Sequence, residues 1–482
     1  MNEIDNKIST QDYQPPEPRH PKWKYASNGT FQFTFNIMNT TMSVYLFFYY
    51  EVVLGLNAWL IFLALAIFTV YDAIDDPIIG FLIDRNFKFT RKWGRRFPWI
   101  VIGSIPWCLS LYLIFTAPNI DASINPWPIF FWLLLSMFVF DTLGALIGIN
   151  VMALRPDLFR TEAERQKFTP YWTLIDILAT TSGMIIPPIF LGFSSGKAAY
   201  SFMGGMIAII AAISAILTFP GAWEDKIVKD RYFATEYKRM NLFKGIFEVI
   251  KTKSFLIYFI VNITFAMIVS MLMANTNYIT AFVLRTGPEM ITIIFGVFIL
   301  GVVVSLPFWL KYLKKTQNNK KVFTIGGVAL SAALIPLTFF QTMIDLFIML
   351  FILGLAMGSM WCFMYTIIQA SVVDDFVVRT KKNQKAILIG TIILLGRLVA
   401  SLDELVFSIV HGLTGFQPGY TTYEALAAVV PDIELVLIGI RLLFGIIPAL
   451  ILLAGTLIFW KFFPLTPDIV LKNKIELEKL GF

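Results

Sequence analysis

The sequence predicts an all-α membrane protein in which twelve transmembrane helices form two six-helix bundles. Of the 482 residues, 57% are hydrophobic and only 15% are charged, and the mean hydropathy is +0.71. Soluble globular domains do not have this composition. About a dozen apolar runs are long enough to cross a bilayer, which takes about 20 helical residues.

The elements follow one another in a regular order. Residues 1–27 are polar and rich in proline, which predicts a disordered cytoplasmic tail. Six spans in residues 28–221 are followed by a linker at 222–253, six more spans in 254–463 and a C-terminal tail at 464–482. Stretch 241–251 of the linker is amphipathic and is predicted to lie along the membrane surface. The predicted spans are residues 28–53, 57–83, 98–117, 128–153, 169–193, 200–220, 254–284, 290–310, 322–341, 345–369, 386–414 and 432–463.

The basic residues predict how these spans are oriented. Of the 39 lysines and arginines, 35 fall in the two tails and in the loops on the same side as the tails. The opposite loops hold only Lys197 and Arg285. Because cytoplasmic loops of membrane proteins are enriched in basic residues, both termini are predicted to be cytoplasmic in a multi-pass protein of the plasma membrane. The net charge of +7 is therefore a topology signal and requires no nucleic-acid partner.

Motifs for chemistry or ATP use are absent from the sequence. The two cysteines, Cys108 and Cys362, and the two histidines, His20 and His411, form no metal-binding or redox motif. The chain also lacks a phosphate-binding loop. We therefore expect no enzyme and no cofactor, and any energy for transport must come from an ion gradient.

Three carboxylates lie in the middle of the second predicted span. Asp75 and Asp76 follow Asp72 by three and four residues, so the three side chains share one helical face. One ionised carboxylate at mid-bilayer costs at least about 2.5–3.5 kcal/mol. The cluster predicts a cation or proton site that faces an aqueous cavity; the alternative is a set of buried pairs that lock helices together.

The predicted eleventh span carries a possible complement. Arg397, Glu404 and His411 are seven residues apart each time, which places them on one face of a continuous helix. Arg397 is predicted to pair with the acids of span 2 or with a substrate; the alternative is neutralisation within span 11 by Asp403 and Glu404. Glu404 is equally consistent with a substrate contact, and His411 is interpreted as a polar residue at a helix interface.

Other polar positions in the spans have less defined roles. Asn36 belongs to a polar stripe on span 1 that either lines the cavity or joins helices. Asp141 on span 4 and Asp176 on span 5 are predicted to be functional, without an assigned role.

Specific motifs resemble one transporter family. The stretch DAIDDPIIGFLID from Asp72, followed by WGRRFPWIVIG from Trp93, resembles the signature of the glycoside–pentoside–hexuronide:cation symporters, the melibiose-permease group of the major facilitator superfamily. Weaker similarity covers residues 153–171 and 371–390. The loop after span 2 also resembles the cytoplasmic gating motif of the superfamily, through Gly80, Asp84, Arg85, Gly94, Arg95 and Arg96.

The resemblance implies a fold and an activity. It implies the major facilitator fold and symport of a small-molecule solute with Na+ or H+ across the lipid bilayer, by alternating access and by a monomer. Asp72 and Asp76 match the cation-site acids of the family, and Asp75 occupies a position that is often asparagine. Arg397 stands where these transporters usually have a lysine.

The cargo implied by the resemblance is a sugar or a glycoside, but several positions depart from the sugar-transporting pattern. Thr69 stands where those members tend to have an arginine, and Gly148 replaces a sugar-binding aspartate, for which Asp141 could compensate. The aspartate expected on span 1 is replaced by Phe35 or Asn36. A lysolipid or an organic acid is therefore the alternative cargo.

Two further questions stay open at this point. Ala145 replaces a cation-ligating threonine, and together with the added charge of Asp75 this favours protons over Na+. A non-transporting sensor or scaffold that reuses the fold is the remote alternative, which would be expected to carry a large signalling domain.

Overall fold

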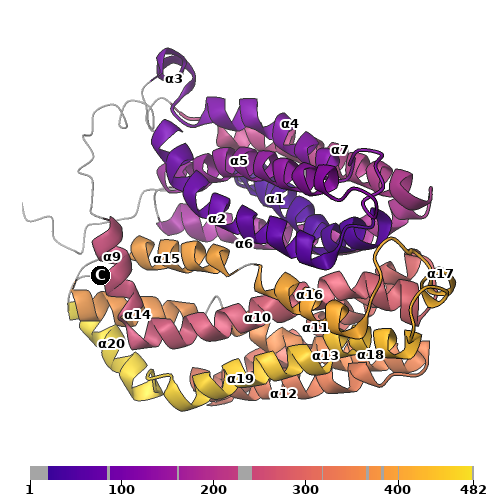
Figure 1. Cartoon of the computed structure of the whole chain (residues 1–482). Coiled ribbons are helices and arrows are strands. Elements are labelled where there is room, and N and C mark those ends of the chain that lie inside the picture. Colours follow the sequence, from indigo (N-terminus) through magenta and orange to yellow (C-terminus); the bar gives the residue numbers. More distant parts are fainter. Residues whose placement is uncertain are drawn as a thin grey trace, which may run out of the picture.

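The computed structural model describes residues 20–83, 87–159, 162–225, 242–316, 318–364, 368–381, 385–399 and 401–479. These residues are helical with short connections, and no strand occurs among them. The chain forms two bundles, one from indigo to magenta and one from pink to yellow (Figure 1). Asp84 and Arg85 of the gating motif lie outside the described residues.

The first bundle contains six long helices and one short helix. The short helix α3 (Lys88–Trp93) lies between the second and third long helices. The long helices are α1 (Lys22–Phe48), α2 (Ala58–Ile83), α4 (Phe97–Ile114), α5 (Trp127–Leu158), α6 (Glu162–Leu191) and α7 (Gly196–Ala222).

The second bundle has the same plan, but two of its spans are divided. Its helices are α10 (Lys253–Tyr278), α11 (Glu289–Thr316), α12 (Asn319–Leu334), α13 (Met343–Phe363), α15 (Lys385–Leu398), α16 (Leu402–Thr414), α18 (Ile433–Phe444) and α19 (Ile446–Phe462). Shorter elements are α9 (Leu242–Ile250), η3 (Ile335–Thr338), α14 (Gln369–Thr380), α17 (Tyr423–Ala427) and α20 (Pro467–Lys479).

The two bundles begin in the same way. α1 continues into a single π-helical turn, η1 (Tyr49–Val53), and α10 continues into another, η2 (Ile279–Val283). Such turns are rare in proteins, and those that occur are often found at functional sites. Their equivalent placement is a structural repeat that the sequences of the two halves do not reveal.

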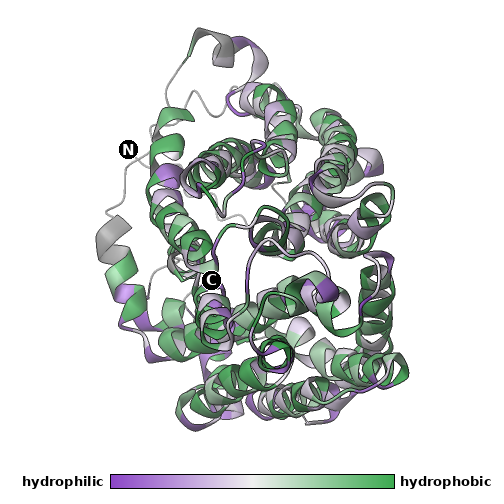
Figure 2. Cartoon of the chain, turned by 45° about the vertical axis from the view of Figure 1, so that its right-hand side comes forward, coloured by the Kyte–Doolittle hydropathy of each residue, from purple (hydrophilic) through white to green (hydrophobic). Residues whose placement is uncertain are grey.

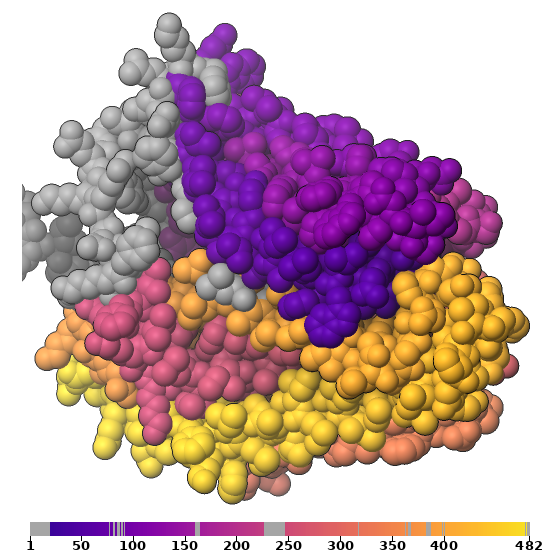
Figure 3. Space-filling view, viewed as in Figure 1, coloured from indigo at the N-terminus to yellow at the C-terminus, as the bar shows by residue number. Residues whose placement is uncertain are grey.

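We name the two ends of the molecule by the elements they carry. The terminal end carries the start of α1 together with α3, α9 and α20. The distal end carries the turn at residues 55–57 and helix α17. At the distal end the surface around the α1–α2 turn (indigo) rests on the orange surface of the second bundle (Figure 3).

Ten helical stretches among the described residues are long and apolar enough to cross a membrane. The predicted spans 1 and 11 are not among them. The polar stripe of α1 lowers its hydropathy, and α15 and α16 are each too short, because one ends at Leu398 and the other begins at Leu402. Hydrophobic residues predominate along the helices, and hydrophilic residues lie mainly in loops and at helix ends (Figure 2).

Close helix packing in the second bundle depends on glycine. A Cβ atom on Gly301 of α11 would collide with the carbonyl oxygen of Phe351, and one on Gly354 of α13 would collide with that of Phe298. Small residues of this kind let two membrane helices approach closely, since lipid supplies no hydrophobic drive between them.

Helices extend further at the terminal end than the apolar runs predict. α1 begins at Lys22, so residues 22–27 are helical although the sequence predicts a disordered tail there. Arg155, predicted in a loop, lies in the last turn of α5, and residues 369–380 form α14. Hydropathy detects only the apolar length of a helix and does not detect its polar extension beyond the bilayer.

Candidate functional site

A charged cluster joins the two bundles between α2, α5 and α15. Arg397 of α15 forms an ion pair with Asp72, and its Nη1 atom lies 3.2 Å from Asp76 Oδ2 and 3.9 Å from Asp141 Oδ1. The pairing of Arg397 with the acids of span 2 is thus present in the structure. The arginine also contacts Asp141, a partner that its sequence position does not reveal.

The fourth acid of the cluster is held by neutral side chains. The Tyr71 hydroxyl donates to Asp75 Oδ1 at 3.3 Å and lies 2.6 Å from Thr142 Oγ1. The Tyr71 ring stacks on Phe138 with centroids 4.0 Å apart. Packing of the ring fixes the hydroxyl that orients Asp75.

Negative charge exceeds positive charge in this cluster. Asp72, Asp76 and Asp141 share the guanidinium of Arg397, and Asp75 forms no ion pair among the described residues. One buried oxygen on each of Asp75, Asp76 and Asp141 has no hydrogen-bond partner among those residues. Buried unpaired carboxylates are costly, so the cluster requires protons or a further cation.

The described residues contain no group of three or more His, Cys, Asp and Glu side chains arranged to hold a metal ion. Arg397 instead fills the space between Asp72 and Asp76. The guanidinium therefore occupies the space between these two carboxylates.

A cavity of about 320 Å³ adjoins the cluster between the bundles. Thr69, one turn before Asp72, and Gly396, next to Arg397, are part of its wall. The Thr69 hydroxyl donates to the Leu65 carbonyl at 2.9 Å. Cavity and charged cluster are thus neighbours on the same helices.

The interruption between α15 and α16 lines this cavity. Val399 and Ser401 are part of its wall, and Asp403 and Glu404 follow in the first turn of α16. Irregular backbone at membrane depth is tolerated where it borders a polar cavity. The break is visible between α15 and α16 in Figure 1.

The break corrects one prediction. Arg397 and Glu404 do not lie on one face of a continuous helix, because α15 ends at Leu398 and α16 begins at Leu402. The ion pairs of Arg397 go to the first bundle, and none among the described residues goes to Asp403 or Glu404. The heptad spacing holds only within α16, from Glu404 to His411.

Two other predicted site residues lie away from this cavity wall. Asn36 Nδ2 donates to Asp176 Oδ1 at 2.6 Å and to Thr180 Oγ1 at 3.2 Å, which joins α1 to α6. This arrangement corresponds to the helix-joining alternative for the polar stripe. Gly148 is buried on α5, and a Cβ atom there would meet no atom within 4 Å.

Gly94, Arg95 and Arg96 of the gating motif lie directly before the start of α4. Gly94 has a φ of 105°, a conformation that favours glycine. The backbone N–H groups of Arg95, Arg96 and Phe97 donate to the Glu224 carboxylate at 3.0, 2.6 and 2.9 Å. Glu224 thereby provides hydrogen-bond acceptors for the free N–H groups at the start of this helix. Its negative charge also interacts favourably with the positive end of the helix dipole.

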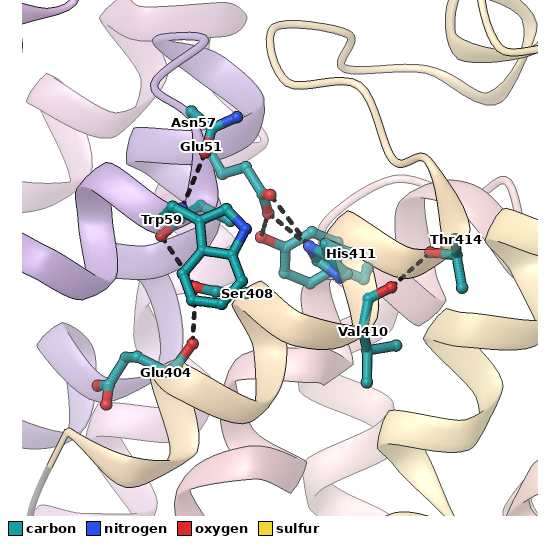
Figure 4. Close-up of polar contacts among 10 residues, drawn as sticks. Glu51, Asn57, Trp59, Glu404, Ser408, Val410, His411 and Thr414 are labelled. Carbon is teal, nitrogen blue, oxygen red and sulfur yellow. Dashed lines mark hydrogen bonds and ion pairs between the residues drawn. The ribbon is translucent and has the colours of Figure 1, made fainter.

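A second contact between the bundles, at the distal end, was not predicted. His411 Nδ1 of α16 lies 3.0 Å from both carboxylate oxygens of Glu51 on η1. The Tyr278 hydroxyl of α10 donates to the same carboxylate (Figure 4 shows the Glu51–His411 contact). We call Glu51, Tyr278 and His411 the distal latch; all three side chains are at least 98% buried.

Some of these residues had a sequence signal. Glu51 is an acid within the apolar run YLFFYYEVVLG, and the interpretation of intramembrane acids as functional applies to it as well as to Asp72. His411 matches its interpretation as a residue at a helix interface. Glu224, in contrast, follows a predicted span and has no pattern that distinguishes it from other loop acids.

The comparisons with known proteins identify the family. Residues 27–467 match the family described as MFS/sugar transport protein. Over 427 residues the chain is 21% identical to the sodium-dependent lysophosphatidylcholine symporter 1-A of Danio rerio, with 81% of this chain and 76% of that protein covered.

Two relatives match over a shorter stretch. The isoprimeverose transporter of Lactiplantibacillus pentosus is 26% identical over 39% of this chain and 38% of its own length. An uncharacterized symporter of Synechocystis is 29% identical over 36% of this chain and 32% of its own length. Each of these two matches thus covers less than two fifths of the relative's own length.

Solved transporters share the fold at low sequence identity. A bacterial homologue of the human lysosomal transporter Spinster, inward-facing and unoccupied, aligns with a TM-score of 0.61 at 13% identity, over 94% of this chain and 98% of that one. A POT family transporter in complex with 5-aminolevulinic acid aligns with a TM-score of 0.57 at 13% identity, over the same shares. The resemblance seen in the sequence is thereby confirmed at the level of fold and family: the chain belongs to the MFS/sugar transport family of the major facilitator superfamily and is a multi-pass membrane transporter.

Proposed function

We propose that the protein is a secondary active symporter that couples a monovalent cation, H+ or Na+, to the movement of a small solute by alternating access. The observation that carries the proposal is the charged cluster, in which Asp72, Asp76 and Asp141 share the guanidinium of Arg397 across the bundle boundary, with Asp75 beside them on α2. Relatives whose names describe them as symporters support the same activity.

The mechanism follows from charge balance. A cation or proton that binds Asp72 and Asp76 competes with Arg397 for the same oxygens. Binding weakens the tie between the bundles and lowers the cost of rearranging them around cargo. Because a ligand shifts an equilibrium only by its different affinity for the two states, the cation drives transport through this competition.

The orientation of the protein follows from its basic residues. The distal loops of the sequence hold only Lys197 and Arg285, so we assign the terminal end to the cytoplasm and the protein to the plasma membrane. With the distal latch closed, the arrangement corresponds to a state closed toward the outside. The cargo is released unchanged, and one chain contains the complete site.

The cargo that we favour is a sugar or a glycoside. The description of the family and the isoprimeverose-transporting relative support it. A lysolipid is the second candidate, because the lysophosphatidylcholine symporter matches over a larger share of the chain. An organic acid is a third possibility that the acidic cluster disfavours by charge.

The test is uptake by the purified protein in liposomes. Sugars, organic acids and lysolipids are offered with an inward Na+ or H+ gradient. Asp72→Asn or Asp76→Asn is expected to reduce concentrative uptake at least about 100-fold, because each removes about 3 kcal/mol of buried ionic interaction. Asp121→Asn, in an exposed distal loop, is the matched control and is expected to transport normally.

Full concentrative uptake by either variant of the cluster would contradict cation coupling at this site. A folded protein is verified in each case by its elution profile and thermal unfolding. Comparison of the two gradients also decides between Na+ and H+, since only the coupling ion drives accumulation.

A further inference from the structure

The carboxylates at the start of α16 are not used by the charged cluster. Asp403 is 95% buried in the cavity wall, and Glu404 lies beside it. The Glu404 Oε2 atom is buried and has no hydrogen-bond partner among the described residues. In Figure 4 the carboxylate of Glu404 points away from the contact between Glu51 and His411.

An unsatisfied donor lies in the same wall. Asn262 of α10 is 91% buried, and its Nδ2 atom has no hydrogen-bond partner among the described residues. Leaving one buried polar group unsatisfied costs about 1–3 kcal/mol. An acceptor and a donor that are both unsatisfied and line one cavity therefore indicate a ligand with complementary groups.

Polarity is distributed unequally between the two walls of the cavity. The wall from the second bundle carries Asn262, Ser270, Asp403 and Glu404. The wall from the first bundle is mainly apolar, with these residues: Met42, Leu46, Phe47, Leu65, Phe68 and Met137. Its polar exceptions are Ser43 and Thr69, and the Thr69 hydroxyl is already bonded to Leu65.

The described residues of the cavity wall offer no basic side chain to an anionic ligand. No lysine, arginine or histidine is part of the cavity wall among the described residues. Arg397, behind Gly396, is already shared among acids of the first bundle. An anionic group in this cavity would face Asp403 and Glu404 without a counter-charge, whereas a donor-rich group would bind them directly.

We propose that Asp403, Glu404 and Asn262 bind the polar end of the cargo, and that this end is a non-anionic group rich in hydrogen-bond donors. Hydroxyl groups of a glycoside and a primary ammonium group share this chemistry. The apolar body of the cargo packs against Met42 and Phe47 of the opposite wall. This inference rests on the proposed transport function and identifies the second bundle as the specificity-determining side.

The assignment differs from the one implied by the family resemblance. That resemblance implies recognition of the sugar from span 1 and span 4, at Asn36 and Gly148. In this chain Asn36 is bonded to Asp176 and Thr180, and Gly148 has no side chain. In our proposal the polar end of the cargo is bound instead by residues of α10 and α16.

The test is equilibrium binding to the purified full chain in lipid nanodiscs, with the coupling ion present. Three probes share a phenyl body: phenyl β-glucoside, phenethylamine and phenylacetate. We expect the glucoside or the amine to bind at least about ten-fold more tightly than phenylacetate, which is the effect of one charge-assisted hydrogen bond. Tighter binding of phenylacetate than of both other probes overturns the proposal.

Two variants and a control test the residues. Glu404→Gln and Asn262→Leu are each expected to weaken binding of the preferred probe at least about ten-fold. The matched control is Glu476→Gln, which changes an exposed glutamate on α20 and is expected to leave binding unchanged. Equal affinity in wild type, Glu404→Gln and Asn262→Leu overturns the proposal.

The same proteins in liposomes separate the two proposals. Failure of the wild type to concentrate any solute under either gradient contradicts symport, even if the binding data agree with the site. Normal coupling with unaltered probe affinity in both variants contradicts only the cargo site. If Glu404→Gln keeps probe affinity but loses ion-driven accumulation, Glu404 belongs to the coupling site and the cargo assignment is wrong.

Discussion

The distal latch and the charged cluster are two ionic contacts between the same bundles, and they differ in the number of carboxylates that share one basic side chain. In the latch one carboxylate, Glu51, receives a hydrogen bond from Tyr278 and contacts His411 through both oxygens. In the cluster three carboxylates contact the guanidinium of Arg397, and a fourth, Asp75, accepts a hydrogen bond from Tyr71. The latch joins η1, α10 and α16 through one carboxylate, whereas acids outnumber basic side chains among the described residues of the cluster.

The surroundings of the two contacts also differ, because the latch is packed among side chains and the cluster lies beside a cavity. Aromatic rings enclose the latch: Phe416 stacks on His411 with centroids 4.6 Å apart, and Phe48 lies edge-on to Tyr278 at 4.9 Å. The Gly419 N–H group also donates to the Glu51 carbonyl at 3.0 Å. The cluster instead adjoins a cavity, whose wall includes Thr69 of α2 and Gly396 of α15.

The largest effect is expected from removal of the single guanidinium. Arg397→Ala leaves Asp72, Asp76 and Asp141 without a basic partner among the described residues, so gradient-driven uptake should fall at least about 100-fold. Arg397→Lys keeps the charge but loses the planar fork, and we expect it to retain uptake within about ten-fold of wild type. Both rates are measured in liposomes.

Wild-type uptake by Arg397→Ala would show that the cluster does not depend on its arginine. The comparison with the latch would then fail, because both contacts would be merely structural. Thermal unfolding of both variants serves as the folding control.

An intermediate effect is expected at the latch. Glu51→Ala removes the acceptor of Tyr278 and the partner of His411, so the state closed at the distal end should lose about 3 kcal/mol. Glu51→Gln keeps a hydrogen-bond acceptor and should lose less. The readout is labelling of Ala274→Cys in the cavity wall by an impermeant thiol reagent from the distal side, with Cys108 and Cys362 replaced by alanine.

Labelling should increase at least about ten-fold in Glu51→Ala, because the distal end opens more often when its ionic contact is lost. The cation dependence of thermal stability should be retained, since the charged cluster is intact. Unchanged labelling would mean that aromatic packing alone closes the distal end.

The smallest effect is expected from a third ionic group at the terminal end. Asp225 accepts hydrogen bonds from His20 at 2.9 Å and Lys24 at 3.0 Å, and its side chain is 44% exposed. Burial opposes its ionisation, but these two partners outweigh burial and hold the pKa of Asp225 below its ordinary value. The folded state therefore gains stability from Asp225 above about pH 4 and loses it as the pH falls further.

Asp225→Asn should lower the melting temperature by no more than about 2 °C at pH 7, because exposed ion pairs contribute little. The difference from wild type should disappear as the pH is lowered below about 4. Scanning calorimetry at several pH values measures both. A decrease as large as that of Glu51→Ala would contradict the ranking by burial.

Much of the fold was predictable because its signals are local. Apolar runs of bilayer length predicted the spans, and the one-sided basic residues predicted an orientation that stays a prediction. The shared face of Asp72, Asp75 and Asp76 follows from helical periodicity alone. The interruption between α15 and α16 was missed, because residues 386–414 form one predominantly apolar run in the sequence.

The sequence by itself therefore determined that this chain is a helical membrane transporter with an acidic site on its second span. Only the tertiary structure decided which groups meet: that Arg397 reaches Asp141 as well as the acids of α2, and that Glu51 meets His411. The reason is physical. Periodicity along one helix depends on residues three and four apart, whereas contacts between α2 and α15, or between η1 and α16, depend on how two bundles pack over hundreds of residues.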